Sequence, residues 1–436
     1  MQQLQGASRF NRRAIKVEQA IQLVVESALP GEKERVPLWQ AGGRRLAESL
    51  SATTDWPPFA RSGMDGYAVR SADTVLASPD SPVTLRVLES VAAGELAAAT
   101  VEPGCATRIM TGGAVPAGAD AVVMLEQTAD ADLDGLPAVR VKAAASLGQN
   151  IAKPGEEFRL GSVIAEPGTR IRPGHAALLG TFGYANVPVF KRPRVAVIAT
   201  GDELLPVTAP LVPGSIRDSN SAMVAALIEQ SGGVPLQMGC MSDDPGAILS
   251  VLVQAYEQAD LIVTTGGVSV GDFDVMAAVM RSIREGSGGI TERFLDYKTA
   301  KLLFDKVAMK PGSPTSAALV DGKLLIALSG NPGACFVGFE LFVKPALLRL
   351  QGASIEASQP RAVTAKLESD FDKGSPHVRF VRTRLFTNDG CLHADPLAFN
   401  KSSMLASIPE ADGLIRIPAG PDGLAKGSIV EVLLLL

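Results

Sequence analysis

The 436-residue chain is poor in the residues that build metal–thiolate sites and disulfide frameworks. It has four cysteines, all far apart (Cys105, Cys240, Cys335 and Cys391), and three histidines. No CxxC pair occurs, and no two histidines have HxxxH or HxH spacing. These spacings disfavour a zinc site and give no sign of a disulfide framework. Serine, histidine and aspartate show no triad arrangement either.

Long apolar runs and long basic runs are also missing. No stretch of about 18 apolar residues occurs, so no membrane-spanning helix is expected. The net charge is −5, which argues against nucleic acid as the main partner. Arg12 and Arg13 are not followed by the apolar segment of a secretory signal. We therefore expect a cytoplasmic protein that binds neither membrane nor nucleic acid.

The composition is that of a globular chain, with 46% hydrophobic and 20% charged residues. Apolar spacing predicts a helix over residues 15–28, and a second short helix is expected over 44–50. Short apolar runs separated by Pro, Gly and Ala predict a β-rich domain over 51–150. Only short strands are expected from residue 351 onward, which favours a small β-barrel or sandwich.

Strands and helices alternate from Arg194 onward. We predict strands at 195–200, 234–241 and 261–264, with helices ending at Gln230 and spanning 245–258 between them. Ser219 or Asn220 is expected to cap the first of these helices. This order predicts a doubly wound parallel sheet, continuing through strands at 304–314 and 323–333 and a helix over 334–350.

The chain is therefore expected to be a multidomain α/β protein. Residues 1–50 and 151–187, the latter with a helix at 173–181, would pack together as a discontinuous N-terminal domain. Residues 51–150 would form a β-rich insertion, 188–350 the α/β domain, and 351–436 the C-terminal β-barrel.

One stretch, LIVTTGGVSVGDFD from Leu261 to Asp274, has the clearest chemistry. A strand leads into a glycine loop, and Asp272 can cap a helix that starts near Val275. Glycine amides can approach an oxyanion closely, whereas two carboxylates in the same turn repel it unless a hard cation lies between them. The pattern favours an anionic substrate held with a divalent metal over the alternative of a helix cap with a tight turn.

The other candidate residues each have a functional and a purely structural interpretation. Glu203 follows a strand end and can bind a cation, act as a base, or merely decorate a turn. Lys306 and Lys310 lie four apart in the predicted 304–314 strand, so they would share a face and neutralise a phosphate, or be ordinary surface lysines. Residues 331–333 (NPG) can be a second anion cradle or a structural turn.

Asp65 in SGMDGYA and Thr111 in RIMTGG lie in the β-rich segment, where each is most simply part of a hairpin turn. Together, however, the motifs form a recognisable series. RSGMDGYAV, RIMTGGAVPAGADAVV, ATGDEL, TTGGVSVGDFD, KPGSP and SGNPGACF, in this order, resemble the MoeA family of molybdopterin molybdenumtransferases, which is related to the E domain of gephyrin.

The resemblance implies an activity and an assembly. The family inserts molybdenum from molybdate into adenylylated molybdopterin, releases AMP and needs Mg²⁺. It implies a homodimer of four-domain chains, with a MogA-like α/β domain. The active site would lie in a cleft between the α/β domain of one protomer and the insertion of the other. A MogA-type adenylyltransferase and cofactor-receiving molybdoenzymes would be further partners.

The resemblance also assigns roles to residues. Asp65 and Thr111 match functional positions, Glu203 an essential glutamate, Asp274 an aspartate near the metal, and Lys306 and Lys310 a lysine pair. Asp244 matches an acidic position less securely and joins Glu203 and Asp274 as a metal-ligand candidate, while Glu157 has a weaker role. The substrate-binding candidates are Gly266, Gly267, Ser269, Gly271, Asn331, Pro332 and Gly333.

Two positions depart from the family pattern. Ser313 stands where the family often has lysine, which removes one cation, and Ser329 stands where it often has proline. Two other functions fit parts of the pattern. A MogA-type molybdopterin adenylyltransferase would resemble residues 190–350 only, and a non-enzymatic scaffold would resemble the gephyrin E domain.

Overall fold

The structure is a computed structural model that describes residues 13–268, 275–285, 299–371 and 374–435. The chain divides into two compact units. The first comprises Met1–Glu48, Pro167–Pro173 and Asn186–Leu436, and the second comprises Ser49–Glu166 and Gly174–Ala185. None of the helices in the described ranges has the length and apolar character needed to cross a membrane.

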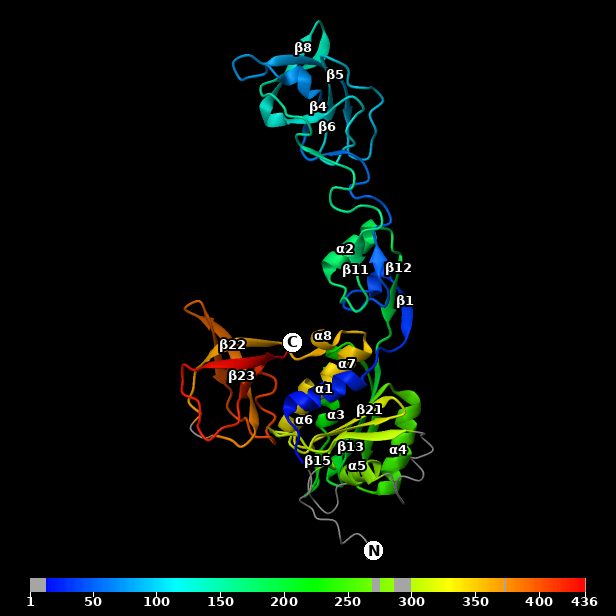
Figure 1. Ribbon diagram of the computed structural model, residues 1–436, viewed down its shortest axis with the longest axis vertical. Coiled ribbons are helices and arrows are strands. Elements are labelled where there is room, and N and C mark those ends of the chain that lie inside the picture. The colour runs from blue at the N-terminus through cyan, green and yellow to red at the C-terminus, as the bar shows by residue number, and fades with distance from the viewer. Residues whose placement is uncertain (1–12, 269–274, 286–298, 372–373, 436) are drawn as a thin grey trace, which may run out of the picture. The chain divides into compact units, whose positions relative to one another are not determined.

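The first unit is built on a mixed sheet (Figure 1). Its strand order is β16 (Val234–Met241), β13 (Arg194–Thr200), β17 (Leu261–Thr265), β21 (Lys323–Leu328), β20 (Ser316–Val320) and β18 (Ala300–Phe304). The strands from β16 to β21 run parallel, which confirms the predicted doubly wound sheet. β20 runs antiparallel to β21, because a two-residue turn joins these two strands directly, and β18 in turn runs antiparallel to β20.

Helices cover both faces of this sheet (Figure 1). Side chains alternate along β13, so that Val195 and Val197 pack with α1 (Val17–Ser27) and α3 (Asn220–Gln230). Ala196 and Ile198 face the other way and pack with α4 (Pro245–Gln258) and α5 (Val275–Glu285). Burial on both faces explains why the strands read as continuous apolar runs.

The last helical stretch of the sheet domain has three parts. α6 (Pro332–Gly338) is followed by a π-helical turn (Phe339–Val343) and by α7 (Lys344–Leu350). The helix predicted over 334–350 is thus confirmed, with a π-helical segment in its middle.

The predicted strand over 304–314 is wrong. β18 ends at Phe304, and the chain then crosses to the C-terminal barrel, where β19 (Met309–Lys310) pairs with β23 (Val378–Asn388). Val307 instead forms a bridge with Ile15, and its N–H donates to the Ser313 carbonyl at 2.9 Å. The backbone groups of this segment therefore pair with Ile15 and with β23, and a single long strand does not form.

The helix expected over 44–50 is also wrong. The Leu46 and Ala47 N–H groups donate to the carbonyls of Thr169 and Pro188, both at 3.0 Å. Nearby, β1 (Lys33–Pro37) pairs with β12 (Asn186–Phe190). Pairing with a distant segment outcompetes the local helical preference, because it satisfies the same backbone groups while burying Leu46 completely.

The second unit is β-rich, as predicted. Its main sheet has the order β7 (Ala121–Met124), β4 (Gly66–Val69), β6 (Cys105–Ile109), β5 (Val83–Val91), β9 (Leu136–Val141) and β8 (Thr128–Leu133). The core includes Tyr67, Leu85 and Val139. The predicted helix at 173–181 is present as α2 (Pro173–Thr181). β2 (Leu50–Ser51) pairs with β11 (Val163–Ala165), and β3 (Arg61–Ser62) pairs with β10 (Ile151–Ala152).

The C-terminal segment forms a closed barrel (Figure 1). The pairing runs from β23 (Val378–Asn388) through β24 (Cys391–Pro396), β22 (Ala362–Leu367), β26 (Ile429–Leu434) and β25 (Gly413–Ile417) back to β23. Closure pairs the edges of the sheet and confirms the barrel that the sequence predicts.

Candidate functional site

Turns that contain glycine follow three central strands at the carboxyl edge of the parallel sheet. The Gly201 N–H, after β13, donates to the Met241 carbonyl at 3.1 Å. The Gly266 N–H, after β17, donates to the Leu328 carbonyl at 3.1 Å. Each turn thus crosses to the neighbouring strand, and ligands of open α/β sheets bind along this edge.

Gly266 and Gly267 permit close packing of these turns. Their φ angles are +98° and +61°, in the region that favours glycine. A Cβ on Gly266 would overlap the Thr200 carbonyl oxygen, and one on Gly267 would lie 2.8 Å from Thr200 Oγ1. Since the Gly266 N–H is already bonded to Leu328, the expectation that this amide donates to an anion is corrected.

Glu203 lies in the turn after β13 with an exposed side chain. Its backbone carbonyl accepts a 2.8 Å hydrogen bond from Ile216, where β14 (Leu204–Leu205) and β15 (Ile216–Arg217) pair. Within the described ranges, the structure records no hydrogen bond or ion pair of its carboxylate. The neighbouring Asp202, by contrast, accepts the Asp243 N–H at 3.0 Å. Glu203 is therefore the acid with a carboxylate available to a ligand or cation.

Asp244 has a structural task. Its Oδ2 accepts the Ala247 N–H at 2.8 Å and caps α4. The other metal candidate, Asp274, lies outside the described residues, as do Ser269 and Gly271. In the part of the chain that the structure describes, no three acidic, histidine or cysteine side chains form a metal-binding group. Of the two metal candidates that the structure describes, Glu203 is the one whose carboxylate has no recorded partner among the described residues, and carboxylate oxygens are ligands that a divalent cation prefers.

The two lysines do not share a strand, which corrects that prediction. Lys306 follows β18, and its carbonyl accepts the Ile15 N–H at 3.1 Å. Lys310 is exposed on β19. Neither ammonium has an ion pair among the described residues, so both charges are available to an anion. Ser313, at the departing family position, donates from Oγ to the Val307 carbonyl at 2.8 Å.

The turn at residues 331–333 does not offer free amides, contrary to the cradle interpretation. Pro332 has no N–H, and the Asn331 N–H donates to Ser329 Oγ at 3.3 Å. The Gly333 N–H donates to the Ser402 carbonyl at 2.8 Å. The hydroxyl of Ser329, the second departing position, is thus used inside this turn. Any contact of these residues with a substrate must use other atoms.

The polar residues at the start of α3 were not predicted as site residues. Asn220 Nδ2 donates to the Gly330 carbonyl at 2.8 Å, which ties α3 to the turn after β21. Ser219 is at the N-cap position, as predicted, but its side chain makes no capping bond, and Asp218 accepts the Ser221 N–H at 3.0 Å instead. Asn220 Oδ1, Ser221 Oγ and Thr200 Oγ1 are buried without a partner in the described residues. The Asp-Ser-Asn run after a proline–glycine loop was the available signal.

Cys240 donates to Asp218 Oδ2 at 3.4 Å. Burial, followed by the charge of Asp218, raises the pKa of the Cys240 thiol to about 11. The thiol therefore stays protonated at neutral pH and is a poor nucleophile.

In the second unit, Asp65 and Thr111 meet. Asp65 Oδ1 accepts the Thr111 N–H at 2.6 Å and the Thr111 hydroxyl at 2.7 Å. These bonds, the backbone one first, lower the pKa of Asp65, with a smaller effect from the charge of Arg108. Both side chains are exposed. A Cβ on the adjacent Gly66 would overlap the Val123 carbonyl, so glycine is required beside the aspartate.

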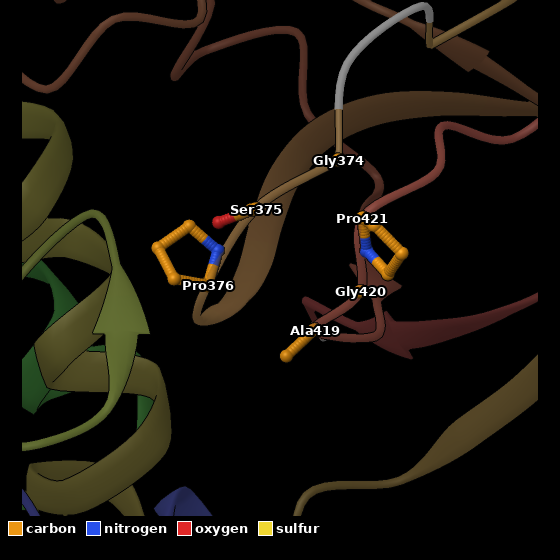
Figure 2. Close-up of a pocket in the computed structure, with 6 residues that line it drawn as sticks. All are labelled: Gly374, Ser375, Pro376, Ala419, Gly420 and Pro421. Carbon is orange, nitrogen blue, oxygen red and sulfur yellow. The ribbon is translucent and has the colours of Figure 1, made fainter.

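The barrel holds a separate hollow of about 570 Å³ (Figure 2). Two facing turns line it, and Ser375 and Gly420 exchange backbone hydrogen bonds of 2.9 Å between them. The lining residues are Gly374, Ser375, Pro376, Ala419, Gly420 and Pro421. None carries a charge, so this hollow lacks the cations that an anionic substrate needs.

The fold and the sheet edge define a class: a multidomain α/β protein with a ligand site at the carboxyl ends of parallel strands. Comparison with known families gives the particular one. The MoeA N-terminal region (domains I and II) matches residues 15–183, a probable molybdopterin binding domain matches 196–349, and the MoeA C-terminal region (domain IV) matches 364–435. The chain belongs to the MoeA family.

Individual relatives agree over nearly the whole chain. A molybdopterin molybdenumtransferase of Bacillus subtilis is 42% identical over 97% of this chain and 95% of its own length. One of Staphylococcus epidermidis is 39% identical over 97% of this chain and 96% of its own. The crystal structure of the molybdopterin biosynthesis MoeA protein of Pyrococcus horikoshii has a TM-score of 0.80 at 30% identity, covering 97% of this chain and all of that one (100%).

Proposed function

We propose that this chain is a molybdopterin molybdenumtransferase that inserts molybdenum from molybdate into adenylylated molybdopterin, with release of AMP. The observation that carries the proposal is the full-length match to relatives of that name. The exposed Glu203 carboxylate at the sheet edge supports it. Other activities of the fold would use only the central α/β portion of the chain.

The charges of the first unit suit this reaction. Molybdate and the phosphates of the pterin substrate are anions that repel each other. The ammoniums of Lys306 and Lys310, which have no ion pair among the described residues, would offset that repulsion, and ammonium groups are common phosphate partners. In the second unit, Asp65 would position Thr111 through its two hydrogen bonds.

Magnesium is part of the proposal. Glu203 and Asp274 would hold it, and Asp244 is a weaker candidate because its carboxylate already caps α4. Bound Mg²⁺ would supply Lewis-acid polarisation of the phosphoanhydride that releases AMP. The role of Glu203 is then to bind the cation at the sheet edge. Its carboxylate oxygens suit this role because they have no recorded partner among the described residues.

The test is cofactor formation in vitro. Purified chain, adenylylated molybdopterin, molybdate and Mg²⁺ are mixed, and product is scored by activation of an apo-molybdoenzyme and by AMP release. Glu203→Gln should lower turnover at least 100-fold with an unchanged melting temperature. Glu257→Gln, an exposed carboxylate near the far end of α4, is the matched control and should be fully active.

Full activity in the Glu203→Gln variant would remove this residue from the mechanism. Transfer of AMP from ATP to molybdopterin, without any need for molybdate, would instead identify an adenylyltransferase. No cofactor formation by the wild type under any of these conditions would favour a scaffold. The homodimer is also part of the proposal, and light scattering should give twice the 45.4 kDa chain mass.

A further inference from the structure

Two arginines of the first unit are held face to face away from the sheet edge. Arg45 and Arg170 are directly opposite each other in an antiparallel bridge. The backbone hydrogen bonds that flank this pair, at 3.0 and 2.8 Å, join the residues before and after it. Such a non-hydrogen-bonded pair brings its side chains closest, on one face. The backbone therefore starts two arginine side chains from neighbouring positions on one face.

A third arginine joins this pair. Arg361 directly precedes β22, and its carbonyl accepts the Leu434 N–H at 2.8 Å, which fixes its backbone. The half-buried Arg45 guanidinium donates from Nη1 to the Gly168 carbonyl at 2.7 Å. Burial, followed by the charges of Arg170 and Arg361, lowers the pKa of Arg45. Arg45 thus lies within electrostatic reach of both Arg170 and Arg361.

Among the residues that the structure describes, no carboxylate forms an ion pair with this arginine cluster (Arg45, Arg170 and Arg361). None of its members has an ion pair among the residues that the structure describes, and the nearby Glu34 pairs with Arg44 instead. Like charges placed directly opposite destabilise a sheet. The cluster therefore carries a repulsion that a bound anion would remove, while Arg170 and Arg361 remain exposed to receive one.

We propose that the arginine cluster binds a small phosphate-bearing anion with at least two negative charges. Guanidinium groups present planar forks of donors that match phosphate oxygens. A single carboxylate would offset only one of the three charges, whereas a diphosphate group can contact all of them. The cluster is not among the residues proposed above for the molybdenum reaction, so this site would be additional.

Calorimetric titration of the full chain with inorganic pyrophosphate tests the proposal. Arg170→Ala and Arg361→Ala should each weaken binding about tenfold, the usual loss for a charged hydrogen bond. Arg192→Ala, an exposed arginine of the same unit, should bind like the wild type. Arg45→Lys keeps the positive charge but loses the planar N–H donors of the guanidinium group, so this variant should also bind pyrophosphate more weakly. Without ligand, Arg170→Ala should melt no lower than the wild type, because repulsion is removed.

Several results would overturn the proposal. The wild type could fail to bind pyrophosphate, or both arginine-to-alanine variants could bind it unchanged. Loss of binding in a Lys306→Ala, Lys310→Ala double variant, with the arginine variants unaffected, would assign the anion to the sheet edge. A shift in oligomeric state in Arg170→Ala and Arg361→Ala, without pyrophosphate binding by the wild type, would assign the cluster to a subunit contact.

Discussion

At the scale of single residues, Gly266 shows how little room the sheet edge leaves. Alanine there would combine a positive φ with an overlap of its Cβ and the Thr200 carbonyl oxygen. We expect Gly266→Ala to lower the free energy of unfolding by about 3 kcal/mol, the sum of backbone strain and overpacking. Urea denaturation measures this loss.

Gly322 provides the matched control for Gly266. It has a similar positive φ of +79°, but an added Cβ would meet nothing within 4 Å. Gly322→Ala should therefore cost only the strain, about 1 kcal/mol. Equal losses in the two variants would show that crowding against Thr200 is unimportant.

The pair of Asp65 and Thr111 makes a prediction about pH. Thr111→Val removes the hydroxyl bond but keeps the backbone bond, so the pKa of Asp65 should rise part of the way to its ordinary value. A lowered pKa in the folded state stabilises the protein above the unfolded pKa of about 3.9, and this contribution is lost as pH falls through the folded value. The Thr111→Val variant should therefore have less of this stabilisation at neutral pH, and the difference from the wild type should disappear as the pH falls below the folded pKa.

Carboxyl-resolved NMR titration of the wild type, Thr111→Val and Thr111→Ser measures this effect. Serine retains a hydroxyl and should keep the pKa of Asp65 low. An unchanged Asp65 titration in the valine variant would mean that the hydroxyl bond does not form in solution.

At the scale of elements, Arg382 joins the barrel to the start of α6. Its guanidinium is buried and donates to Ser407 Oγ at 2.7 Å and to the Phe399 carbonyl at 2.9 Å. Gly333 packs so closely on this group that a Cβ there would overlap it. The segment around Ser402, which accepts the Gly333 N–H, is therefore held against the turn at residues 331–333.

We expect Arg382→Met to lower the free energy of unfolding by about 3–5 kcal/mol, because buried acceptors lose their donor. Hydrogen exchange of the Gly333 amide should accelerate as well. Arg384→Met is the control, since Arg384 forms only an exposed ion pair with Glu410 and should cost about 1 kcal/mol or less. Similar losses in both variants would contradict the anchoring role of Arg382.

At the scale of the whole molecule, the two compact units have separate cores. We expect calorimetry to resolve two unfolding transitions. Val139→Ala in the second unit and Val263→Ala in the first both remove methyl groups from fully buried sites. Each should cost about 2 kcal/mol and lower only the transition of its own unit. A single transition shifted equally by both variants would show that the units unfold together.

Most elements of the fold were predictable from sequence because their signals are local. Apolar runs predicted β13, β16 and β17, and the helix predicted over 245–258 is α4. The segments 44–50 and 304–314 were mispredicted for the opposite reason. Several of their backbone groups pair with residues more than 60 positions away, such as Thr169 and Ile15, and no local pattern predicts such partners.

By itself, the sequence determined the parallel sheet, the barrel, and the motifs that place the chain in its family. These depend on side-chain periodicity and turn chemistry, which neighbouring residues encode. Only the tertiary structure decided which polar groups are free. It commits the Gly266 and Gly333 amides to distant carbonyls, gives the Glu203 carboxylate no partner among the described residues, and brings Arg45 opposite Arg170. The physical reason is that each backbone or charged group is satisfied by whichever partner folding brings within reach, however distant in the chain.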